Sequence, residues 1–184
     1  MRPRPLVVFD RLDLLEWQFC QRVSRLSAYR PWRVTLQAAS RLGDWPVWVL
    51  LILAQPWLQP NGAWRVMQYS VIALFAITIY RLVKTRLCRE RPFITYGEST
   101  YGKGIQCCEP ARDRYSFPSG HTMHAVMFSV LVAAHTPWLL PVILPLTLLI
   151  AISRVGLGLH YVSDVLAGAA LGYAFALASL YLMG

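Results

Sequence analysis

The sequence predicts an all-α fold, a polytopic membrane helix bundle with five or six transmembrane helices and an N-terminal amphipathic helix. Hydrophobic residues make up 56% of the 184 residues and charged residues only 15%. An ordinary soluble domain is roughly 45–50% apolar and about 25% charged. This chain has far more apolar surface than a solvated coil, which excludes a disordered chain. The apolar residues gather in blocks, which indicates a membrane protein. With 4 cysteines, a disulfide-rich secreted scaffold is also excluded. We expect a single domain, residues 1–184.

Residues 1–43 form the predicted N-terminal amphipathic region. Within residues 11–28, apolar side chains recur at intervals of three and four, and charged side chains occupy the other faces. Such a helix lies in the membrane interface or covers part of the protein's own surface, and the sequence leaves both placements open. If it crosses the membrane, it is the sixth span. The apolar stripe consists of Leu12, Leu15, Phe19, Val23 and Leu26.

Five apolar blocks follow, and each is predicted to cross the membrane. A crossing helix needs about 20 apolar residues, with a range of roughly 17–25. Several blocks are shorter than this, and the first one is expected to gain length by extending backward through residues 36–42. The blocks are 45–58, 64–80, 123–134, 139–152 and 162–183.

Positive charge is concentrated in two parts of the chain, residues 2–41 and 81–114, and the net charge is +9. A basic balance indicates nucleic acid, anionic lipid or an anionic substrate as partner. No basic face sits on a soluble domain, so we expect no nucleic acid and favour lipid head groups or a phosphate substrate. The long polar segment 81–120 joins two spans, and long loops are usually functional.

Three polar clusters lie at the ends of spans, and connectivity places them at one membrane face. The first two clusters share one loop, while the third and fourth spans cross out and back to return the chain to that face. The clusters are Lys84 with Arg91-Pro92, then Pro118-Ser119-Gly120-His121, then Ser153-Arg154 with His160 and Asp164.

This face is suited to binding a phosphate. Lys84, Arg91 and Arg154 supply positive charge that can neutralise a phosphate dianion. Ser119 and Gly120 open a helix, whose unpaired N–H groups and dipole favour an anion. Gly120 also lets the backbone approach a ligand closely. We therefore expect these five residues to bind substrate phosphate.

The remaining polar groups fit phosphoryl transfer. His160 and Asp164 are four residues apart, so on a helix they would share a face and hydrogen-bond. A carboxylate on one imidazole nitrogen leaves the other as nucleophile. His121 is then available to protonate the leaving oxygen. We expect a phosphohistidine intermediate, with no metal and no cofactor.

Together, Lys84-x6-Arg91-Pro92, Pro118-Ser119-Gly120-His121 and Ser153-Arg154-x5-His160-x3-Asp164 resemble the complete three-part signature of the type-2 phosphatidic acid phosphatase superfamily. Each part alone is a weak signal, but all three in order are highly specific. The resemblance covers roughly residues 64–183, the predicted catalytic core. It implies that His160 is the nucleophile, that Asp164 orients it and that His121 is the acid, with the same five phosphate ligands.

The resemblance to small bacterial members implies a lipid phosphate substrate in the plasma membrane. Undecaprenyl diphosphate, hydrolysed to undecaprenyl phosphate, is the first substrate we expect, and phosphatidylglycerophosphate or phosphatidic acid are the alternatives. If another lipid's hydroxyl accepted the phosphoryl group, the same residues would make a lipid phosphotransferase. A membrane transporter, with the buried charges lining a pathway, is the alternative that involves no enzyme.

Other polar residues near the clusters have plainer interpretations. Arg86 and Arg89 are expected to be interfacial anchors whose long side chains reach the head groups. His124 lies one turn after His121 and is expected to have no role, as is His135 at a span end. Ser153 binds either phosphate or its own helix, and the sequence favours neither.

Two considerations disagree about the membrane side. Every Lys and Arg except Arg65 lies on the side of the polar clusters, which the positive-inside rule assigns to the cytoplasm. The resemblance implies an outward-facing site in most bacterial members, and we expect the site to face the periplasm. There Cys88 could pair with Cys107 or Cys108, whereas in the cytoplasm these residues would be thiols.

Overall fold

The structure, a computed structural model, describes residues 7–95 and 113–184. Within these ranges the regular secondary structure is helical, apart from an isolated β-bridge between Glu90 and Tyr115. The all-α prediction is therefore confirmed. The helices are α1 (Val7–Leu26), α2 (Arg30–Leu42), α3 (Trp45–Leu58), α4 (Gly62–Leu87), α5 (Pro92–Thr95), α6 (Gly120–His135), the 3-10 helix η1 (Pro137–Leu139), α7 (Leu140–Gly156) and α8 (Val162–Met183).

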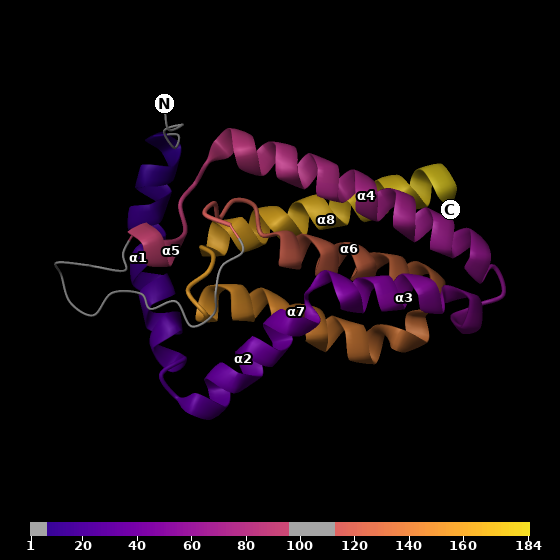
Figure 1. The fold of residues 1–184 in the computed structure, drawn as a ribbon, viewed down its shortest axis with the longest axis horizontal. Helices are drawn as coiled ribbons and strands as arrows, with labels where there is room; N and C mark the ends of the chain where they lie inside the picture. The colour runs from indigo at the N-terminus through magenta and orange to yellow at the C-terminus, as the bar shows by residue number, and fades with distance from the viewer. Residues whose placement is uncertain (1–6, 96–112) are drawn as a thin grey trace.

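The long helices form a bundle that is closed at one end by α1 (Figure 1). Helix α6 packs between α7 and α8, α3 lies along α4, and α2 lies against α7 (Figure 1). Helix α1 runs across the end of the bundle, where it contacts α5 and α7 (Figure 1).

The predicted apolar blocks correspond to helices, with one correction. Blocks 45–58 and 162–183 coincide with α3 and α8, and α4 continues past its apolar block through several basic residues. The backward extension of the first block through residues 36–42 is wrong, because these residues belong to the separate helix α2. The chain bends at Gly43 and Asp44, and Pro46 opens α3 in the first turn, where proline is well tolerated.

Helix α1 presents two different faces. Asp13 and Cys20 are buried against the protein. Three members of the predicted apolar stripe, Leu15, Phe19 and Leu26, are instead exposed by 78%, 55% and 59%. Leu12 and Val23 are half-buried, and Val23 packs against the protein. Because most of the stripe is exposed, α1 is suited to lying in the membrane interface.

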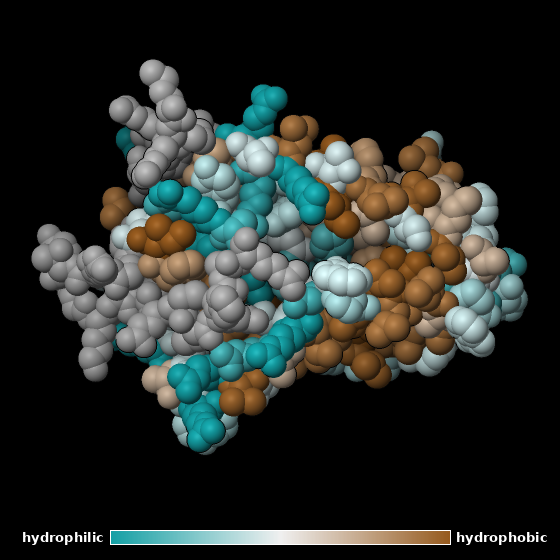
Figure 2. Space-filling model, in the orientation of Figure 1, coloured by the Kyte–Doolittle hydropathy of each residue, from teal (hydrophilic) through white to brown (hydrophobic). Residues whose placement is uncertain are grey.

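The outer surface of the bundle is apolar. Figure 2 shows hydrophobic side chains over the bundle and hydrophilic ones gathered toward the end that carries α1 and α2. Among the described helices, α4, the segment Pro137–Gly156 and α8 are long and apolar enough to cross a membrane, and α3 is apolar but shorter. The total of five or six spans remains a prediction. Large exposed apolar side chains include Leu50, Leu74, Phe75, Val142, Leu148, Leu166 and Leu182.

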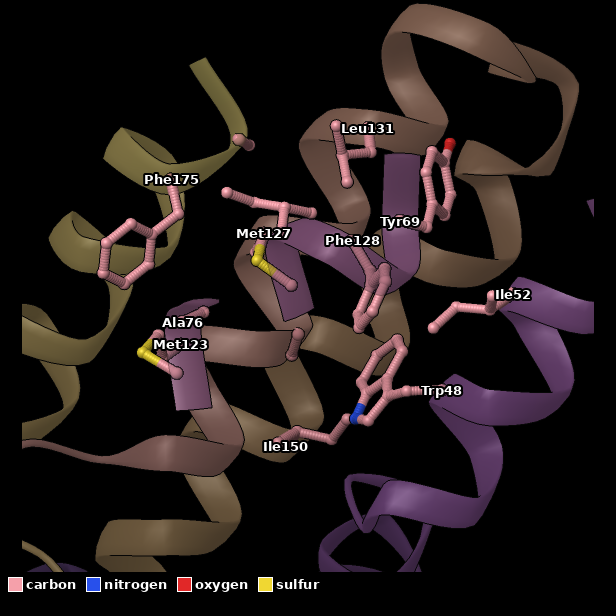
Figure 3. Close-up of a cluster of buried hydrophobic side chains, with 13 residues drawn as sticks. Trp48, Ile52, Tyr69, Ala76, Met123, Met127, Phe128, Leu131, Ile150 and Phe175 are labelled. Atoms are coloured by element: carbon pink, nitrogen blue, oxygen red, sulfur yellow. The ribbon is translucent and has the colours of Figure 1, made fainter. Parts of the chain in front are cut away.

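The core lies between α3, α4, α6, α7 and α8, and α6 supplies more of its side chains than any other helix (Figure 3). Trp48 of α3 stacks on Phe128 of α6 with ring centroids 5.1 Å apart. Met123 and Met127, also on α6, are fully buried in the same cluster (Figure 3). This packing fixes α6, whose first turn carries the predicted phosphate-binding residues.

Two glycines of α8 allow α6 to approach it closely. A Cβ atom on Gly168 would lie 2.4 Å from the carbonyl oxygen of Ser119, and one on Gly172 would lie 2.2 Å from that of Met123. Pairs of small residues four positions apart let membrane helices pack with their backbones in contact. The α6–α8 contact therefore sets the position of Ser119 relative to α8.

We predict that Gly172→Ala destabilises the bundle, because its new methyl group would overlap the backbone of α6. Overpacking of this kind costs about 1–3 kcal/mol. Thermal unfolding in detergent, followed by tryptophan fluorescence, should show a lower midpoint for this variant. Ala170→Val, which enlarges an exposed position on the same helix, is the matched control and should unfold like the wild type. An unchanged midpoint for Gly172→Ala would contradict the packing.

Candidate active site

The three predicted clusters meet at the end of the bundle that α1 crosses (Figure 1). Lys84 lies in the last turn of α4, His121 in the first turn of α6 and Arg154 in the last turn of α7. His160 precedes α8, and Asp164 lies in the first turn of that helix. The site residues are nearly all buried, at 7% exposure or less: Lys84, Arg91, Ser119, Arg154, His160 and Asp164.

His160 lies between a cation and a carboxylate. Its Nε2 is 3.2 Å from Nη1 of Arg91, and its Nδ1 is 3.5 Å from Oδ2 of Asp164. Among the described residues Nδ1 has no hydrogen-bond partner, so the Asp164 contact is close without being a hydrogen bond. This arrangement directs Nε2 toward the predicted phosphate-binding cations.

The expectation that His160 and Asp164 share a helix face is wrong in one respect. α7 ends in a turn in which the N–H groups of Leu159 and His160 both donate to the carbonyl of Arg154, and Gly158 has a left-handed φ of 74°. His160 is therefore outside α8. The two residues meet because this turn, rather than helical periodicity, brings the imidazole back to the first turn of α8.

His160 is neutral at neutral pH. Burial lowers the pKa of its imidazole well below the ordinary value, and the positive charges of Arg91, Arg154 and Lys84 lower it further. A neutral imidazole has the lone pair that a nucleophile needs. The same cations that would bind phosphate therefore keep His160 in its reactive form.

A carboxylate that the sequence did not single out bridges two of these cations. Oδ2 of Asp113 is 2.9 Å from Nζ of Lys84, and its Oδ1 accepts a hydrogen bond from Nη2 of Arg91 at 2.8 Å. Burial opposes ionisation, but Lys84 and Arg91 hold the pKa of Asp113 below its ordinary value. The Asp113 carboxylate thus occupies the position of an anion between two predicted phosphate ligands.

The first turn of α6 is held against its neighbours by short contacts. The N–H of Ser119 donates to the carbonyl of Asp164 at 3.0 Å, and its hydroxyl contacts that of Thr122 rather than capping the helix. A Cβ atom on Gly120 would lie 2.9 Å from the ring of Tyr80. A larger residue at position 120 would therefore displace the ring of Tyr80, beside the N–H of Gly120 that is expected to bind phosphate.

Arg89 is not the interfacial anchor that the sequence predicts. Its side chain is fully buried, and α4 ends just before it with Cys88 in a left-handed conformation at φ 51°. Its Nη1 donates to Asp164 Oδ1 at 2.6 Å, and its Nη2 donates to Asp13 Oδ1 at 2.7 Å. The guanidinium also lies 4.0 Å from the ring centroid of Tyr161. Arg89 therefore connects α1 to the carboxylate beside His160.

Several other polar residues make contacts that involve no phosphate-binding group. Ser153 donates to the carbonyl of Ile150 in its own helix at 2.6 Å. His124 contacts the carbonyl of Gly120 one turn earlier, and His135 contacts the hydroxyl of Tyr69. Arg86 is exposed, as an interfacial anchor should be.

Part of the site is contributed by residues near the N-terminus. Nη1 of Arg154 donates to the hydroxyl of Ser40 at 2.5 Å. Nε2 of His121 lies 3.0 Å from Oδ1 of Asp44. No sequence pattern identified Ser40 or Asp44, because each is a single short polar residue in a segment rich in apolar and basic ones.

In the described ranges, 7–95 and 113–184, no group of three or more His, Cys, Asp and Glu side chains is placed to hold a metal ion. Cys88 is a buried free thiol. Its suggested partners, Cys107 and Cys108, lie outside the described residues.

Comparison with known proteins agrees with this helical bundle. The family model of the PAP2 superfamily matches residues 65–184. The fold resembles that of a PAP2-type phosphatidylglycerolphosphate phosphatase from Bacillus subtilis, with a TM-score of 0.69 and 20% identity over 93% of this chain and 85% of that one. It also resembles LpxE from Aquifex aeolicus, with a TM-score of 0.75 and 19% identity over 91% of this chain and 95% of that one.

The chain is therefore an α-helical membrane protein with a polar site at one end of its bundle, and it belongs to the PAP2 superfamily. The family resemblance inferred from the three clusters is confirmed. The matched region begins at residue 65, so Asp13, Ser40 and Asp44 are contributed from outside it.

We predict that Asp113→Asn strengthens anion binding, because the carboxylate would no longer compete for Lys84 and Arg91. Inorganic phosphate should protect the variant against thermal unfolding at concentrations about three- to tenfold lower than the wild type requires, a change of about 1 kcal/mol. Glu90→Gln removes a carboxylate that pairs with the exposed Arg114 and is the matched control. Unchanged or weaker phosphate binding by Asp113→Asn would contradict this role.

Proposed function

We propose that this protein is a membrane lipid phosphatase that hydrolyses a phosphomonoester or diphosphate of a lipid through a phosphohistidine on His160. The observation that carries the proposal is the environment of His160. Its imidazole is buried, neutral and 3.2 Å from Arg91, at the polar end of a bundle whose outer surface is apolar. Membership of the PAP2 superfamily supports the same chemistry.

In the first step, the substrate phosphate displaces the Asp113 carboxylate and binds Lys84, Arg91, Arg154, the hydroxyl of Ser119 and the N–H of Gly120. Nε2 of His160 attacks phosphorus, and the bond between phosphorus and the leaving oxygen breaks. His121 gives its proton to that oxygen, so the lipid departs as an alcohol or, from a diphosphate, as a monophosphate. Fixed cations near the phosphoryl oxygens stabilise the charge of the transition state.

In the second step, water replaces the lipid. His121, now neutral, takes a proton from this water as its oxygen attacks phosphorus. The bond between phosphorus and Nε2 breaks, inorganic phosphate leaves and His160 is neutral again. Asp164, close to Nδ1, stabilises the positive imidazole of the intermediate, and Arg89 holds Asp164 in place.

The apolar exterior supports a substrate with a lipid tail that reaches the site from the membrane. Undecaprenyl diphosphate is the first substrate we propose. The Bacillus subtilis relative is a phosphatidylglycerolphosphate phosphatase, which supports phosphatidylglycerophosphate as the second, followed by phosphatidic acid. A phosphotransferase would use the same first step, with a lipid hydroxyl in place of water in the second.

We further propose that the reaction needs no metal, since Lys84, Arg91 and Arg154 already supply the positive charge that a divalent cation would bring to phosphate. The proposed location is the bacterial plasma membrane with the site facing outward. The family resemblance supports this orientation, although the distribution of basic residues favours the opposite one.

We predict that purified wild-type protein in detergent releases inorganic phosphate from at least one of undecaprenyl diphosphate, phosphatidylglycerophosphate and phosphatidic acid, with or without EDTA. His160→Ala should lower kcat by about a thousandfold or more, because the nucleophile is lost. His135→Asn, at the opposite end of α6, is the matched control and should keep wild-type activity.

Each failure would contradict a different part of the proposal. If the wild type releases no phosphate from any of the lipids, the proposed hydrolase activity is wrong. A lipid phosphotransferase or a membrane transporter then becomes the better explanation. If EDTA abolishes release, the metal-free mechanism is wrong. If His160→Ala keeps its activity, the nucleophile is misassigned.

A further inference from the structure

The bend between α2 and α3 packs directly on the ring of His121. Gly43 and Asp44 make this bend, and Nε1 of Trp48 donates to the carbonyl of Gly43 at 3.0 Å. A Cβ atom on Gly43 would lie 3.0 Å from Cδ2 of His121 and 3.0 Å from Cγ2 of Ile150. The Trp48 hydrogen bond therefore holds the bend to α3, and the contact with His121 packs it against the first turn of α6.

Asp44 turns its carboxylate toward His121 instead of toward its own helix. It occupies the N-cap position of α3, but within the described chain its side chain makes no capping hydrogen bond there. Its Oδ1 lies 3.0 Å from Nε2 of His121, and the two side chains are 22% and 21% exposed. An aspartate at an N-cap ordinarily accepts from the helix N–H groups, so this orientation calls for another role.

The two histidines of the site have contrasting surroundings. Nε2 of His160 faces the guanidinium of Arg91, and its contact with Asp164 lacks hydrogen-bond geometry. Nε2 of His121 faces a carboxylate at hydrogen-bond distance. A carboxylate fixes the tautomer of an imidazole and stabilises its protonated form, while a cation disfavours that form. These different environments favour His121 as the general acid and His160 as the nucleophile.

We propose that Asp44 is the positioning residue for the general acid His121 in the phosphatase reaction. The inference rests on the proposed function, since it presupposes that His121 protonates the leaving oxygen. Asp44 accepts the Nε2–H of the His121 imidazolium and keeps the ring at the site, and Nδ1–H gives its proton to the leaving oxygen as the bond to phosphorus breaks. The neutral imidazole then receives a proton on Nδ1 from the attacking water.

The test uses leaving groups that differ in their need for a proton. The alkoxide of diacylglycerol is a poor leaving group and needs general acid catalysis, which contributes about a hundred- to ten-thousandfold. The nitrophenolate of an octyl-substituted nitrophenyl phosphate departs without a proton. A residue that positions the acid affects the first substrate selectively, whereas a residue that only stabilises the fold affects both equally.

We predict that Asp44→Asn lowers kcat for short-chain phosphatidic acid about ten- to a hundredfold and that for the nitrophenyl substrate less than about threefold. Asparagine has the same size and is an equally good N-cap, so α3 should be kept. Asp44→Ser, which also caps helices, should give the same pattern. Glu90→Gln, whose carboxylate pairs with Arg114, is the matched control and should change neither rate.

His121→Asn, measured in parallel, separates the two levels of inference. If it loses activity selectively on phosphatidic acid while both Asp44 variants lose it equally on the two substrates, or lose none, the role of Asp44 is overturned and the proposed function stands. If His121→Asn is not selective, the assignment of the acid is wrong, and with it the role of Asp44. Selective loss in His121→Asn and in both Asp44 variants supports the proposal.

Discussion

The arrangement of the active end depends on the burial of one guanidinium. Arg89 has no exposed surface, and a charge removed from water must be paired. Its partners come from opposite ends of the chain, Asp13 on α1 and Asp164 on α8, at 2.7 and 2.6 Å. Removing one partner of such a buried pair costs about 3–5 kcal/mol. The ion pairs therefore fasten the amphipathic helix to the bundle and hold Asp164 beside His160.

A second constraint is the positive charge gathered for phosphate. The three cations that supply it, Lys84, Arg91 and Arg154, are all buried. Each contacts a side-chain oxygen atom of the protein in the position where we propose that a phosphate oxygen binds. Asp113 bridges the first two, and Ser40 accepts from the third. Without substrate the Asp113 carboxylate compensates the charges of Lys84 and Arg91. The three cations also keep the nearby imidazole of His160 neutral and nucleophilic.

The sequence predicted the parts of the molecule that local pattern controls. Apolar runs gave α3 and α8 with their bounds, and span connectivity brought the three clusters to one end. Arg89 was predicted to be an interfacial anchor because it is a basic residue at the end of a span. The sequence does not indicate its ion-pair partner, since Asp13 lies 76 residues away. Asp44 and Asp113 were missed for the same reason, since each acquires its role from side chains that only the fold brings near.

A covalent bond between phosphorus and His160 is the central claim, and trapping it is the most direct test. The wild type would be mixed with a lipid phosphate carrying radioactive phosphorus, quenched in alkali during turnover and digested. Label that is stable to base, labile to acid and confined to the peptide containing His160 is the predicted result, with no label in His160→Ala. Continued turnover with no trapped label, or label on another residue, would contradict the mechanism.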